Sequence, residues 1–274
     1  MRSLIAGVAL SLFSASLMAC TAPDTTDGQA DEEEVGSAQE ADRGSSGSNG
    51  LIDFDYLVAV QTVYQVAKTY PLVVSGTKTI HPSVINALYV NGAGKNILKY
   101  AVACAAPEGV PLYDGTDFLT GRGHLISGAA WMNGALSAAA VNSLMACIAV
   151  HVNPYGVTVP ILLMGGDVQD DTYAHSGFDV QEAFWTSNPS PASGLVSITV
   201  WPSAAISQKC SNPLSAFKNR ICGQHPNSPA CNLTLGTTPC TVDSVGNRTC
   251  GGQPAIETRL NKTDFDFLYK ICGG

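Results

Sequence analysis

One short stretch of the chain combines carboxylates and an imidazole at a density that could bind a metal ion. Residues 166–179 follow an apolar segment and contain four aspartates and one histidine: Asp167, Asp170, Asp171, His175 and Asp179. Carboxylate oxygens are the usual ligands of Ca²⁺, and aspartate with histidine suits Zn²⁺. The spacing matches neither an EF-hand loop nor a His-Glu-x-x-His helix, and a solvated acidic turn is the commoner arrangement. We therefore keep Asp167, Asp170, Asp171 and His175 as the ligands of an alternative hypothesis, a secreted metal-assisted hydrolase.

Two other residues have side chains suited to acid–base chemistry. Glu182 could serve as a general base near His175, with its pKa raised by burial against Trp185, but we expect a glutamate on a helix surface. His151 falls in the last turn of a predicted helix, where the helix dipole favours a cation, and we expect it to cap the helix. His124 lies in a predicted turn and is given no role. No nucleophile elbow, Ser-x-x-Lys pair or P-loop is found, so the sequence indicates no catalytic centre and no cofactor.

Aromatic residues offer a different kind of site, because their large flat faces suit a glycan or peptide groove. The candidates are Trp131, Trp185, Trp201, Tyr113, Tyr155 and Phe184. Core packing is the alternative, and we prefer it for at least two of the three tryptophans.

The nine cysteines divide into one near the start of the chain, Cys20, and eight others. The eight are Cys104, Cys147, Cys210, Cys222, Cys231, Cys240, Cys250 and Cys272. None has the Cys-x-x-Cys spacing favoured by structural zinc sites. An even number in an exported chain predicts four disulfides, whose connectivity the sequence alone does not fix. Because Cys104 and Cys147 both fall on the apolar faces of predicted helices, a bridge between them is our first expectation.

Cys20 stands at the end of an export signal. Met1-Arg2-Ser3 gives a cationic start, an apolar run extends to Leu17, and Leu17-Met18-Ala19-Cys20 follows. This ending resembles the lipobox of bacterial lipoproteins. The resemblance implies that the signal is cut before Cys20, that Cys20 carries diacylglycerol, and that its new amino group is acylated, including by palmitate. Thr21 resembles the second residue of lipoproteins sorted to the outer membrane, which implies a location in the cell envelope, on its periplasmic face or at the cell surface. An ordinary secretory signal with an incidental cysteine is the alternative.

The segment after Cys20 has the composition of a tether. Residues 21–50 hold eight acids, one base and no aromatic residue, and they end in a Gly/Ser-rich run. Such a segment is predicted to be disordered, because it has too little apolar surface to offset the entropy of ordering. From residue 51 onward there are 14 acids and 12 bases, a net charge of −2, and no basic cluster. A nucleic-acid partner is therefore disfavoured.

Hydrophobic periodicity predicts both helices and strands. Helices are expected over residues 51–70, 82–90, 96–106 and 135–152, the last being the most regular, and strands over 157–164 and 195–201. The valines of 51–70 leave a strand open as the alternative there. Pro160 within the first strand indicates an edge or a bulge. Beyond residue 209 the chain holds six cysteines and little apolar sequence, so we expect this part to depend on its disulfides.

These patterns predict an α+β protein with several helices packed on a small sheet and a disulfide-rich, irregular C-terminal part. The expected organisation is a signal peptide (1–19), a lipidated cysteine and acidic tether (20–50), a globular domain (51–205) and a Cys-rich extension (206–274). Residues 98–188 loosely resemble uncharacterised cysteine-rich surface proteins of gliding soil bacteria. That likeness rests on 100–105, on Cys147 with 151–160, and on 181–185, and it implies no activity. The sequence therefore favours a non-enzymatic binding or structural module, attached to a membrane by its lipid and recognising an unknown protein or glycan ligand.

Overall fold

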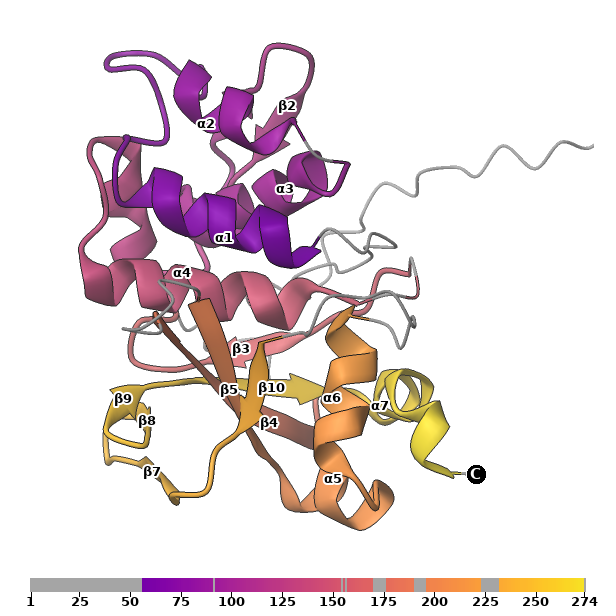
Figure 1. Cartoon of the computed structure of the whole chain (residues 1–274). Helices are drawn as coiled ribbons and strands as arrows, with labels where there is room; N and C mark the ends of the chain where they lie inside the picture. The colour runs from indigo at the N-terminus through magenta and orange to yellow at the C-terminus, as the bar shows by residue number, and fades with distance from the viewer. Residues whose placement is uncertain are drawn as a thin grey trace, which may run out of the picture. The chain divides into compact units, whose positions relative to one another are not determined.

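Helices form the first half of the described chain (Figure 1). The computed structural model describes residues 56–90, 92–153, 155, 157–169, 176–189, 196–222 and 232–273. The helices of this half are α1 (Tyr56–Ala67), α2 (Pro82–Leu88), α3 (Gly94–Ala105) and α4 (Ala138–His151). Between α3 and α4 lie the hairpin strands β1 (Pro111–Tyr113) and β2 (Phe118–Thr120) and the 3-10 helix η1 (Ser127–Met132). The four predicted helices are thus confirmed, with ends shifted by a few residues.

Local sequence explains where two of these helices begin. Pro82 occupies the first turn of α2, where its missing N–H costs nothing, and Nδ1 of His81 accepts a hydrogen bond from the Ser83 amide at 3.2 Å. Ser137 caps α4 by accepting from the amide of Ala140 at 3.3 Å.

A five-stranded sheet forms the second half. Its order is β3 (Leu162–Met164), β10 (Ile256–Leu260), β4 (Val180–Pro189), β5 (Val196–Pro202) and β6 (Leu233–Leu235). The β5–β6 pair is parallel and the other pairs are antiparallel. The expected strand at 157–164 shortens to β3, which follows Pro160 and lies at the edge of the sheet, as that proline indicated.

The Cys-rich segment contributes to this same sheet. It supplies β10 and β6, the helices α5 (Ala204–Lys209), α6 (Pro213–Cys222) and α7 (Lys262–Leu268), and the 3-10 helix η2 (Lys270–Gly273). It also forms a small three-stranded sheet of β7 (Cys240–Val242), β8 (Arg248–Cys250) and β9 (Gln253–Pro254). The α+β class is confirmed, and the sheet crosses the predicted division between residues 205 and 206.

Helix α4 joins the helical half to the sheet. It packs against α1 and α3 on one side and against β4, β5 and β10 on the other, so nearly every residue from Ala140 to His151 is buried. A helix that is apolar all round is typical of such a central position. Ser187 of β4 ties the sheet to it by donating to the carbonyl of Asn142 at 2.8 Å.

One segment folds differently from our expectation. Residues 181–185, expected on a helix, lie in strand β4, which pairs with β10 on one edge and β5 on the other. Both faces of this central strand are partly covered, so its burial does not alternate and its sequence lacks the period of an exposed strand. Within the described residues no helix is both long and apolar enough to cross a membrane.

Candidate functional site

Two sulfurs and two imidazoles meet in the interior between α3 and α4. Cys104 of α3 and Cys147 of α4 form a disulfide with Cα atoms 6.2 Å apart, which confirms the predicted bridge. His151 lies one turn after Cys147, and His124 comes from the loop between β2 and η1. The two imidazole rings stack with centroids 5.1 Å apart, and both residues are only 1% exposed. We call these four residues the Cys/His cluster.

Hydrogen bonding leaves most imidazole nitrogens of the Cys/His cluster without partners. Nδ1 of His151 donates to the carbonyl of Cys147 at 2.6 Å and lies 4.0 Å from Sγ of Cys104. Its Nε2, and both ring nitrogens of His124, are buried with no partner among the described residues. A buried polar atom left unsatisfied costs about 1–3 kcal/mol. Three such atoms in one place therefore mark the Cys/His cluster as incomplete.

Both histidines are held in the neutral state. Burial lowers the pKa of His151 to about 4, with smaller contributions from the charges of Arg220 and Arg122, while its bond to the Cys147 carbonyl acts in the opposite direction. Burial and the neighbouring His151 lower the pKa of His124 well below its ordinary value. Desolvation of His151 therefore outweighs the helix dipole, which would favour a cation at this position. The cap itself is present, as the bond to the Cys147 carbonyl.

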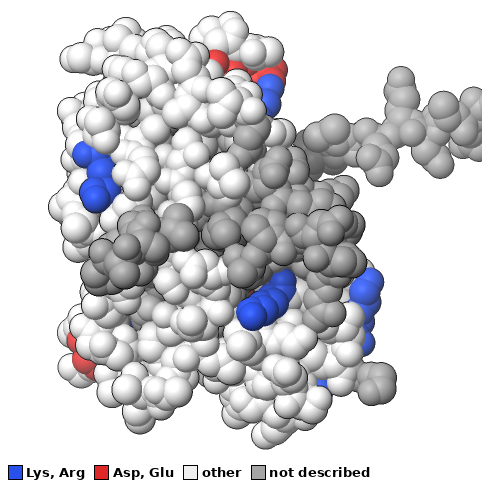
Figure 2. Space-filling model, in the orientation of Figure 1, with Lys and Arg blue, Asp and Glu red and all other residues white. Residues whose placement is uncertain are grey.

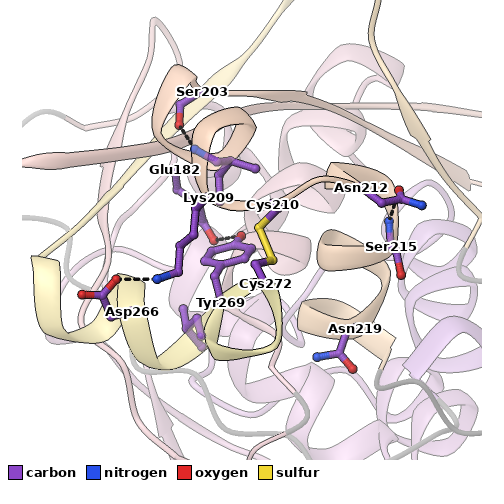
Figure 3. The surroundings of a disulfide bond; sticks show 12 residues. Glu182, Ser203, Lys209, Cys210, Asn212, Ser215, Asn219, Asp266, Tyr269 and Cys272 are labelled. Atoms are coloured by element: carbon purple, nitrogen blue, oxygen red, sulfur yellow. Dashed lines mark hydrogen bonds and ion pairs between the residues drawn. A yellow bond between two sulfur atoms is a disulfide. The ribbon is translucent and has the colours of Figure 1, made fainter. Parts of the chain in front are cut away.

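A second buried polar cluster lies in the sheet half, and Figure 3 shows two of its members, Glu182 and Tyr269. Glu182 of β4 points inward, and its Oε1 accepts hydrogen bonds from Nε of Arg220 at 2.7 Å and from the hydroxyl of Tyr269 at 2.6 Å. Glu182, Arg220 and Tyr269 are all fully buried. Arg220 also donates to the carbonyls of Val150 and Val152, at 2.9 Å to the first, where α4 ends. We call Glu182, Arg220 and Tyr269 the Arg/Glu cluster.

The Arg/Glu cluster has the character of a structural brace. Burial and the negative charge of Glu182 raise the pKa of Tyr269 well above its ordinary value, so its hydroxyl remains a donor. The Arg220 guanidinium satisfies carbonyls at the end of α4 that the helix leaves without partners. The expectation of a surface glutamate at 182 is wrong, and a fully buried carboxylate paired with Arg220 is poorly placed to act as a general base on a bound molecule.

The disulfide Cys210–Cys272 links the end of α5 to η2, near Tyr269 of the Arg/Glu cluster (Figure 3). Beside it, Lys209 pairs with Asp266 of α7 at 2.7 Å. A third disulfide, Cys240–Cys250, links β7 to β8, and Cys222 is also disulfide-bonded. Cys20 and Cys231 lie outside the described residues.

Of the four predicted metal ligands, only Asp167 lies within the described residues. Oδ1 and Oδ2 of Asp167 accept hydrogen bonds from the amide and hydroxyl of Ser127 at 2.8 and 2.6 Å, so this carboxylate anchors the start of η1. Asp170, Asp171 and His175 lie outside the described residues, and their convergence on a metal stays a prediction.

Most of the candidate aromatic residues serve the core. Trp131 and Trp185 are fully buried, as preferred, with their indole N–H groups bonded to the Tyr70 carbonyl and the Thr258 hydroxyl. Trp201 is half-buried beside Phe184 on the next strand. The described residues on the face of the molecule shown in Figure 2 include few, scattered Lys, Arg, Asp and Glu side chains.

No family model, curated protein sequence or solved structure matches this chain. The function must therefore be argued from its own residues. Among the described residues, Cys104, Cys147 and His151 form a group of potential metal ligands. Their ligand atoms lie within 4.8 Å of one another. Sequence reasoning paired the two cysteines but gave no role to His124, since nothing local in its turn signals burial.

Proposed function

We propose that this protein is a lipid-anchored module of the cell envelope that binds or supports other envelope components without catalysing a reaction. The observation that carries the proposal is Leu17-Met18-Ala19-Cys20 at the end of an apolar signal, followed by an acidic tether. A multi-chain lipid anchor holds a protein firmly, at about 0.8 kcal/mol for each buried methylene. The tether then separates the folded part from the bilayer.

The disulfides support the extracytoplasmic location. Cys104–Cys147, Cys210–Cys272 and Cys240–Cys250 are formed, and Cys222 is bonded as well. Such bonds persist in oxidising compartments and are rare in reducing ones. With Cys20 occupied by lipid, the remaining cysteines are even in number, so all of them can pair.

The burial of the titratable groups supports a non-enzymatic role. Acid–base catalysis needs a side chain within hydrogen-bond reach of a bound molecule. In the described part of the chain, His124, His151 and Glu182 are enclosed by protein. The hydrolase alternative has less support, because both oxygens of Asp167 already hold Ser127.

Replacing the lipidated residue tests the proposal. Cells expressing the wild type, Cys20→Ser or the matched control Thr21→Ser are separated into membrane and soluble fractions after labelling with palmitate. We expect the wild type and Thr21→Ser to be labelled and to sediment with membranes, whereas Cys20→Ser is unlabelled and not processed at Cys20. A Cys20→Ser protein that is processed and sediments as before would refute the anchor. A chelator-sensitive hydrolysis of esters, peptides or glycans by the purified protein would refute the non-enzymatic role.

A further inference from the structure

The incomplete hydrogen bonding of the Cys/His cluster points to a ligand. We propose that Cys104, Cys147, His124 and His151 form a buried site for Zn²⁺, or a similar tetrahedral divalent metal, when the chain is reduced. The Cys104–Cys147 disulfide is then the alternative, metal-free state of the same four residues.

The side-chain types match this class of metal. Structural zinc sites use four thiolate and imidazole ligands in a tetrahedron, and Cys₂His₂ is a common set. The Cys/His cluster supplies two sulfurs and two imidazoles in a buried interior.

Three of the four ligands already lie close together. The ligand atoms of Cys104, Cys147 and His151 are within 4.8 Å of one another, whereas His124 is stacked on His151 and must move toward the sulfurs to complete the set. With metal–sulfur and metal–nitrogen bonds of about 2.3 and 2.0 Å, tetrahedral geometry places sulfur and nitrogen about 3.5 Å apart and the two sulfurs about 3.8 Å apart. Nδ1 of His151 is already 4.0 Å from Sγ of Cys104. The sulfurs separate once their bond is broken, and Cα atoms 6.2 Å apart leave room between them.

Each imidazole of the Cys/His cluster can offer the lone pair of one ring nitrogen to a metal. Nδ1 of His151 becomes the ligand when its proton moves to Nε2 and its hydrogen bond to the Cys147 carbonyl breaks. Among the described residues, that Nε2 and both nitrogens of His124, which is stacked on His151, have no partner, so metal binding through His124 breaks no hydrogen bond within that part of the chain. The metal thereby offsets part of the cost of burying these atoms.

Ordered backbone holds the four residues together. Cys147 and His151 are one turn apart on α4 and share a face. The loop that carries His124 is fixed to α3 by the hydrogen bond from the Leu125 amide to the Cys104 carbonyl at 2.9 Å. Helices α3, α4 and η1 also pack directly on one another. The ligands therefore stay close together even without the disulfide.

The switch between the two states is a two-electron reduction. A phosphine reductant takes oxygen from water and becomes phosphine oxide, and each sulfur gains one electron and one proton as the S–S bond breaks. Zn²⁺ then displaces the two thiol protons and forms two metal–sulfur bonds. Exchange with an external disulfide, which takes up the two electrons and two protons and becomes two thiols, reforms the Cys104–Cys147 bond and releases the metal.

Cysteine protection in the reduced mature protein tests the site. After phosphine treatment, the protein is incubated with Zn²⁺ alone and alkylated, and the modified cysteines are mapped by peptide mass. We expect Zn²⁺ to protect Cys104 and Cys147, and Co²⁺ in its place to give thiolate charge-transfer and tetrahedral d–d absorption. His151→Phe and His124→Phe should each weaken Zn²⁺ binding at least tenfold, since loss of even a supporting partner costs roughly 10–100-fold.

The control variant is His81→Asn, which alters a histidine outside the Cys/His cluster and should bind Zn²⁺ like the wild type. Circular dichroism follows the fold throughout. If reduction unfolds the chain, Zn²⁺ should restore the helical signal of the wild type but not of His151→Phe or His124→Phe. The site is refuted if Zn²⁺ fails to protect Cys104 and Cys147, if protection is equal in the histidine variants, or if an unfolded reduced chain is not restored.

Discussion

The two buried polar clusters meet at the C-terminal end of α4 and differ in how completely their atoms are paired. In the Arg/Glu cluster, a positive and a negative side chain neutralise each other, and the guanidinium also satisfies the last carbonyls of the helix. Oε2 of Glu182 nevertheless has no hydrogen-bond partner among the described residues, and in the Cys/His cluster equally deep burial leaves three imidazole nitrogens without one. The first cluster is thus a structural brace, whereas the second is less completely paired. The comparison predicts that the Arg/Glu cluster contributes stability through its ion pair, whereas the Cys/His cluster contributes it through its disulfide and makes stability depend on pH.

The largest effect should come from breaking the buried ion pair. Arg220→Met leaves Glu182 charged and without its cation in the interior, which typically costs about 3–5 kcal/mol. Urea unfolding followed by circular dichroism measures the loss in the free energy of unfolding.

The matched control is Lys262→Met, which breaks the exposed pair with Asp266 on α7. Exposed pairs one helical turn apart contribute little to stability, because water and salt screen them. Similar losses in the two variants would show that Arg220 is no brace.

Removing the Cys104–Cys147 disulfide should have the next largest effect. It closes a separation of 43 residues, for which the chain-entropy estimate is about 4 kcal/mol. The Cys240–Cys250 bridge spans only 10 residues and should contribute about 3 kcal/mol. The two double Cys→Ala variants, unfolded in urea under oxidising conditions, test this order. The reverse order would mean that loop length does not govern the contribution of these bridges.

Acid should weaken the fold through the histidines. His151 has a pKa of about 4 when folded and about 6.5 when unfolded, so between these values the unfolded chain binds the extra proton. The contribution of neutral His151 to the free energy of unfolding is complete above about pH 6.5. About 2–3 kcal/mol of it is lost as the pH falls toward 4. His124 acts in the same direction. In thermal unfolding from pH 7 to pH 4, His151→Phe should show a shallower decline than the wild type, and an equal slope would contradict this assignment.

Local periodicity was sufficient to predict the helical half. The spacing of apolar residues located α1 to α4, and the placement of Cys104 and Cys147 on apolar faces predicted their bridge. The predictions were wrong or silent for residues whose burial depends on partners distant in the sequence. Glu182 is buried because Arg220, 38 residues further along the chain, neutralises it, and a central strand covered on both faces lacks an alternating pattern. His124 is buried because its turn packs beneath two helices, which no nearby residue reveals.

The central claim is that Cys20 carries lipid while the other eight cysteines pair with one another outside the cytoplasm. The intact mass of the mature protein from membranes, measured before and after reduction, tests both parts at once. We predict a chain that begins at Cys20 with the added mass of an acylated diacylglyceryl group, and a gain on reduction of one hydrogen for each of the eight remaining cysteines. A mature chain without added lipid, or with free thiols before reduction, would contradict the account.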